Sequence, residues 1–75
     1  MSDYEVGIYN SRVRSVLRSG EPWQDPTISK DYESVLYFPI CNSASIEETQ
    51  RRVAKEWPPE QGFVLDYIKL ITPEN

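Results

Sequence analysis

Residues 45–71 decide the fold, and they read SIEETQRRVAKEWPPEQGFVLDYIKLI. Ser45 and Glu48 have the spacing of a capping box, in which the serine caps the helix and the glutamate reaches back to the preceding backbone. Pro58 excludes helical geometry from the residue before it, so we predict a helix that ends at Trp57. The apolar residues that share one helical face, and so predict the side toward the core, are Ile46, Val53, Ala54 and Trp57.

The second half of this stretch predicts a strand. Gly62 closes a turn, and residues 63–71 are apolar on both sides of an alternating pattern, apart from Asp66 and Lys69. Strands buried on both faces have this composition. We therefore expect residues 63–71 to be the central strand of a sheet.

The N-terminal part predicts a strand followed by a short helix. Residues 4–9 alternate between two faces, with Tyr4, Val6 and Ile8 on one of them. Asn10 or Ser11 then offers a helix N-cap. Three apolar residues at helical spacing predict a helix over residues 11–19, with Gly20 as its stop, and they are Val13, Val16 and Leu17.

Residues 21–34 form a long connection with two prolines, and connections of this length tend to carry function or to move. Its apolar residues, Trp23, Ile28 and Tyr32, are able to pin it to the core as a lid. Residues 35–41 predict the next strand. Pro39 lacks a backbone donor, which indicates a sheet edge or a bulge.

The order of elements is therefore β-α-β-α-β in a single domain of 75 residues, with a short polar tail at 72–75. This order predicts an α+β two-layer sandwich, a three-stranded sheet with both helices on one face. If each helix joins parallel neighbours, the crossovers are right-handed. We expect the covered face to hold Val6, Ile8, Leu36, Phe38, Ile40, Phe63 and Leu65.

The opposite face of such a sheet is open. Alternation assigns to it a set of aromatic and aliphatic side chains together with Asp66. A contiguous apolar surface usually marks an interaction site, unless the 21–34 loop or the tail folds over it. Val64 belongs to this face, and the candidate interaction surface consists of Tyr9, Val35, Tyr37, Ile68 and Leu70. A one-residue shift in the third strand would exchange its two faces.

Basic residues concentrate on the two predicted helices. Arg14 and Arg18 lie one turn apart on the first, and Arg51 and Arg52 are neighbours on the second. These four arginines form a candidate basic patch. It is either a solvated helix surface or a docking site for an acidic partner or a phosphate-bearing ligand.

Composition argues against most catalytic chemistry. The chain has no histidine, which removes the commonest general base near neutral pH. Its one cysteine, Cys41, has no charged neighbour in sequence to lower the thiol pKa, so we expect a buried thiol at a strand end. The sequence also lacks a phosphate-binding loop and the ligand spacing of a zinc or calcium site. We therefore predict no enzymatic activity, no cofactor and no metal.

Charge and hydropathy suggest where the protein works. A net charge of −4 disfavours nucleic acid and anionic lipid as partners, and the apolar runs are too short to span a membrane. The acidic residues 1–5 do not resemble a signal peptide. With a single unpaired cysteine, these features predict a cytoplasmic protein. Our hypothesis is an interaction module or accessory subunit that binds a protein partner or a second copy; the alternative is a nucleic-acid or phosphate-ligand binder.

Overall fold

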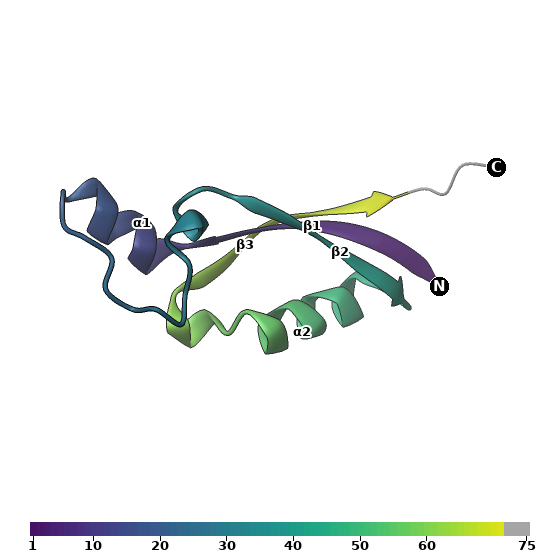
Figure 1. Ribbon diagram of the computed structural model, residues 1–75. Coiled ribbons are helices and arrows are strands. Elements are labelled where there is room, and N and C mark those ends of the chain that lie inside the picture. Colours follow the sequence, from purple (N-terminus) through teal and green to yellow (C-terminus); the bar gives the residue numbers. More distant parts are fainter. Residues whose placement is uncertain (72–75) are drawn as a thin grey trace.

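The computed structural model describes residues 1–71, and the polar tail expected at 72–75 lies outside them (Figure 1). The elements are strands β1 (Ser2–Asn10), β2 (Leu36–Ser43) and β3 (Phe63–Ile71), helices α1 (Ser11–Arg18) and α2 (Ile46–Glu56), and the short 3₁₀ helices η1 (Lys30–Glu33) and η2 (Pro59–Gln61). The α+β class and the order β-α-β-α-β are confirmed.

The three strands form one antiparallel sheet in the order β2-β1-β3. The prediction that residues 63–71 form the central strand was wrong, because β1 holds that place. Val6 and Ile8 of β1 are fully buried on one face, and Gly7 is buried on the other. Since β2 and β3 both pair with β1, helix α2 carries the chain across β1 from one edge to the other.

Helix α2 runs along one face of the sheet, and α1 lies at the end of the sheet, following directly from β1 (Figure 1). The core lies between α2 and the sheet, and α2 lies closer to β2 than to β3. The core is built from Val6, Ile8, Ile40 and Val53, with Tyr32, Phe38, Trp57, Phe63, Leu65 and Ile68 packed around them.

The capping box of α2 forms as predicted. The Ser45 hydroxyl accepts from the Glu48 amide at 3.1 Å, and the Glu48 carboxylate accepts from the Ala44 amide. That backbone donor holds the pKa of Glu48 below its usual value. The predicted apolar face was partly wrong: Ile46 and Ala54 are exposed, while Thr49 is fully buried.

Thr49 occupies a core position of α2 because its hydroxyl has hydrogen-bond partners there. Its hydroxyl lies 2.7 Å from the hydroxyl of Ser43, which is also fully buried, and 3.0 Å from the Ser45 carbonyl. A buried hydroxyl with these partners avoids the cost of desolvation without a hydrogen bond. The first turn of α2 is thereby tied to the end of β2.

The 21–34 loop packs onto the covered side of the fold. Ile28 is buried, and the Trp23 indole donates to its carbonyl at 2.8 Å. Tyr32, in η1, stacks near Phe38 with ring centroids 6.2 Å apart and accepts from the Trp57 indole at 3.1 Å. Of the three apolar residues that the sequence analysis named, Tyr32 pins the loop to the core, while Trp23 and Ile28 are joined to each other within the loop.

Strand β2 is an edge strand, as Pro39 predicts, and its backbone is irregular. Pro39 has no N–H, Asn42 adopts a positive φ of 56° beside an irregular register, and the Arg52 guanidinium donates to the Cys41 carbonyl at 2.8 Å. The expectation of a buried Cys41 thiol was wrong, because Cys41 lies in this irregular edge segment and is exposed.

Strand β3 contains a β-bulge that the sequence pattern does not reveal. Gly7 pairs with Tyr67 and Ile8 with Leu65, so Asp66 is an extra residue without an opposite on β1. The extra residue reverses the phase of every later side chain. Ile68 therefore packs against the core, and Leu70 lies opposite the buried Tyr4, which corrects their assignment to the open face.

A buried asparagine joins the end of β1 to the turn before β3. The Asn10 Oδ1 caps α1 by accepting from the Arg12 and Val13 amides at 2.9 and 3.1 Å, and its Nδ2 donates to the Gln61 carbonyl at 3.1 Å. Gly62 closes that turn with φ 96°, and an added Cβ there would lie 2.8 Å from Asn10 Oδ1. One side chain thus fixes the junction of three segments.

Candidate functional site

The open face of the sheet is the surface opposite α2. Its ordered centre is formed by four residues: Glu5 and Gly7 of β1, Tyr37 of β2 and Tyr67 of β3. Tyr9, Val35 and Val64 continue it toward α1, since Tyr9 pairs with Val64 and Val35 lies against Gly7. We call these seven residues the tyrosine face.

Tyr67 lies across the central strand because Gly7 has no side chain. A Cβ on Gly7 would come within 2.6 Å of the Tyr67 ring, so the aromatic side chain occupies the space that a larger residue would need. The Tyr67 hydroxyl donates to the Glu5 carboxylate at 2.7 Å. This hydrogen bond, with a smaller contribution from burial, raises the pKa of Tyr67 to about 12. The phenol therefore stays protonated and fixed.

The second part of the tyrosine face is held by α1. The Arg14 guanidinium lies over the Tyr9 ring, 3.8 Å from its centroid, and its Nε donates to the Glu33 carbonyl at 2.9 Å. Cation–π contacts of this kind stabilise an aromatic ring in one orientation. Tyr9 and Arg14 are both half-buried as a result.

Tyr37 is the accessible member of this face. It is 62% exposed, and its ring lies 5.9 Å from that of Tyr67 at an angle of 50°. Because the 21–34 loop packs on the covered side, it leaves Tyr37 uncovered. Tyr67 was missed by the sequence analysis, since the bulge at Asp66 changes which β3 residues face this side. Alternation along β1 places Glu5 on the face of Tyr9, but Glu5 was not selected as a site residue. The glycine at position 7, beside aromatic residues, was the available signal.

The candidate basic patch is not assembled into one surface. Arg14 and Arg18 belong to α1 at the end of the sheet, whereas Arg51 and Arg52 belong to α2 beneath it (Figure 1). Arg14 and Arg52 already donate to backbone carbonyls of neighbouring segments. Two of the four guanidinium groups therefore have structural partners.

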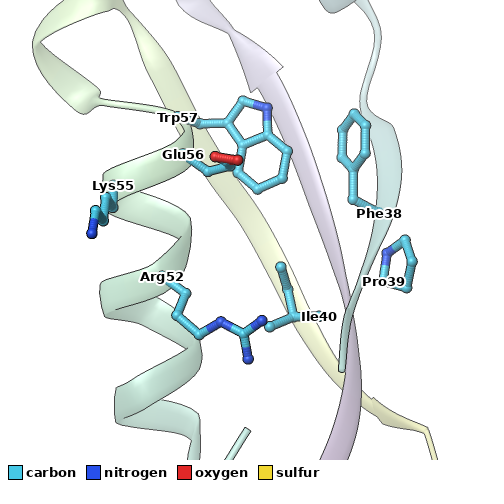
Figure 2. A pocket seen from close by; sticks show the side chains of 7 residues that line it. All are labelled: Phe38, Pro39, Ile40, Arg52, Lys55, Glu56 and Trp57. Carbon is cyan, nitrogen blue, oxygen red and sulfur yellow. The ribbon is translucent and has the colours of Figure 1, made fainter. Parts of the chain in front are cut away.

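Helix α2 is flanked by two grooves. Figure 2 shows the groove toward β2, where charged side chains of α2 lie beside aromatic and aliphatic ones; its lining residues are Phe38, Pro39, Ile40, Arg52, Lys55, Glu56 and Trp57. The groove toward β3 is predominantly apolar, and it is lined by Gln50, Val53, Ala54, Trp57, Pro59, Phe63 and Leu65. The second groove is bordered by Phe63 and Leu65 of the edge strand β3.

Within residues 1–71, histidine, cysteine and carboxylate side chains nowhere gather in a group of three that could hold a metal ion. The helices in this range are also too short and too polar to cross a bilayer. No family model matches the chain, and no curated protein or solved structure is detectably similar to it. The tyrosine face therefore has to be interpreted from its own chemistry.

Proposed function

We propose that this protein is a non-enzymatic interaction module that binds a protein partner through the tyrosine face. The observation that carries the proposal is the exposure of Tyr37, 62%, at the centre of an otherwise ordered aromatic surface. Tyrosine combines a large apolar area with few rotatable bonds and is enriched among residues that dominate protein interfaces.

The rigidity of the neighbouring side chains supports the same proposal. Tyr67 is held by its hydrogen bond to Glu5 and by packing over Gly7. Tyr9 is held by the cation–π contact with Arg14. A surface whose side chains are already ordered loses less conformational entropy when it binds. Lys69, which pairs with Glu5, places a charged side chain at the border of this face, and such a group is suited to the rim of an interface.

We further propose a cytoplasmic location, because a single free thiol stays reduced in that compartment. We also propose an accessory role in an assembly, since covering a sheet face that exposes several ordered aromatic residues removes apolar surface from water.

The test compares two variants of the immobilised protein in a cell extract. Tyr37→Glu places a charge on the tyrosine face, and Ile46→Glu places the same charge on the exposed side of α2, where the side chain is 51% exposed. We expect the wild type and Ile46→Glu to retain the same protein and Tyr37→Glu to lose it, with circular dichroism of all three unchanged. Equal retention by all three would contradict the proposal.

A further inference from the structure

Strand β3 is unusual for an edge strand. Seven of its nine residues, FVLDYIKLI, are apolar or aromatic, yet every one of the nine is half-buried or exposed. Native proteins normally protect an edge of this kind with proline, charges or short length, because its free backbone groups pair readily with another strand. β2 has such protection in Pro39. β3 has no proline over nine residues, and its protection is limited to the bulge at Asp66 and the charges of Asp66 and Lys69.

On the side of the sheet that faces α2, the first half of β3 borders an apolar groove and the second half exposes an apolar side chain. Phe63 and Leu65, in the first half, line the apolar groove beside Val53 and Trp57. Leu70, in the second half, projects from the same side of the sheet opposite Tyr4 and is 51% exposed. The strand therefore carries an apolar groove at one end and an exposed apolar side chain at the other.

We propose that two copies of this chain associate by antiparallel pairing of their β3 strands, which gives a continuous sheet in the order β2-β1-β3-β3-β1-β2. An antiparallel pair has a two-fold axis perpendicular to the sheet, so the first half of each strand meets the second half of the other. With the axis near Ile68, Leu70 of each copy lies beside Leu65 of the other and covers its apolar groove.

Charge complementarity favours a second copy over an unrelated strand. The charged residues of β3 are Asp66 and Lys69, both exposed. The same two-fold axis brings Lys69 of one copy next to Tyr67 and Asp66 of the other, twice over. Opposite charges and cation–π pairs on neighbouring strands are stabilising, and one register supplies both.

The arrangement also leaves room for the helices. α2 lies closer to β2 than to β3, so at least three strand spacings, about 14 Å, would separate the two α2 axes. A helix with its side chains is about 10–12 Å wide. The space between the helices is then filled by the side chains of the two grooves and the two Leu70 residues.

This pairing can be tested separately from the proposed function, because Leu70 lies on the α2 side of the sheet and Tyr37 on the opposite side. Tyr67 of the tyrosine face would border Lys69 of the other copy. We expect light scattering after size exclusion to give twice the chain mass of 8.7 kDa at high protein concentration and a lower mass on dilution. Leu70→Glu should raise the dimer dissociation constant about 100-fold or more, since it places a charge in the apolar groove.

Tyr37→Glu is the matched control, and it should leave the dimer intact while it removes partner binding. Leu70→Glu should conversely retain partner binding as a monomer, so failure of one proposal is distinguishable from failure of the other. Amide hydrogen exchange gives a second measure: β3 amides should become protected as the protein concentration rises.

Three results would overturn the inference. The first is a monomer at every concentration up to about 1 mM, since a dissociation constant above this value corresponds to a pairing free energy of less than about 4 kcal/mol. The second is a dimer that Tyr37→Glu dissociates and Leu70→Glu does not, and the third is a dimer in which hydrogen exchange of the β3 amides is independent of protein concentration. The second would instead place self-association on the tyrosine face.

Discussion

Gly7→Ala tests the physical basis of the tyrosine face. The new methyl group would lie 2.6 Å from Cε1 of Tyr67 and 2.9 Å from Cγ1 of Val35, and both distances are shorter than contacts that a Cβ tolerates. Forcing extra volume into a packed site costs about 1–3 kcal/mol. Alanine is about 0.5–1 kcal/mol more favourable than glycine within a strand, so we expect a net loss of about 1–2 kcal/mol.

Urea unfolding followed by far-ultraviolet circular dichroism measures this change in the free energy of unfolding. In a separate thermal unfolding experiment, the melting temperature of a domain of this size should fall by about 5–15 °C. The decisive comparison repeats Gly7→Ala in a Tyr67→Ala background, where the ring is absent and the Val35 methyl can move away. There the substitution should be neutral or slightly stabilising, which leaves a coupling energy of about 1–2 kcal/mol. An equal loss in both backgrounds, or a gain from Gly7→Ala alone, would refute the reasoning.

Three further predictions follow from single contacts. Asn10→Ala should destabilise the fold by about 2–3 kcal/mol in urea unfolding, because it removes the α1 cap and leaves the Gln61 carbonyl without its donor; a loss below about 0.5 kcal/mol would contradict this role. Ser45→Ala should cost about 1 kcal/mol, since only the α2 cap is lost, and a loss equal to that of Asn10→Ala would be inconsistent with the difference in burial. The pKa of Tyr67 is raised from 10 to about 12 in the folded protein, so the stability contributed by its bond to Glu5 is present below pH 10 and is lost between pH 10 and 12; Glu5→Gln should reduce this alkaline loss, and identical pH profiles would exclude it.

Local signals in the sequence were sufficient for the elements themselves. The capping box at Ser45, the proline after Trp57 and the glycine at position 62 act within a few residues, so the bounds of α2 and β3 follow from the sequence almost without error. Pro39 likewise identified an edge strand, because a missing N–H has the same consequence in any sheet.

Properties that depend on pairing could not be predicted in this way. The bulge at Asp66 exists only in relation to β1, and it moves Ile68 to the core and Tyr67 to the tyrosine face. Tyr37 precedes any such irregularity and could be placed correctly from alternation alone. The composition of residues 63–71 predicts burial on both sides, but not whether the covering surface belongs to the same chain.

The irregular edge of β2 has a consequence for how large an assembly can grow. A sheet with two pairable edges extends without limit, since every added copy presents a new edge. Here the β2 edge lacks the Pro39 donor, has a positive φ at Asn42 and has the Cys41 carbonyl bonded to Arg52, so it is the poorer of the two edges for pairing. The β3 pairing that we propose would consume the better edge in both copies, and its product would be a closed pair rather than a fibre.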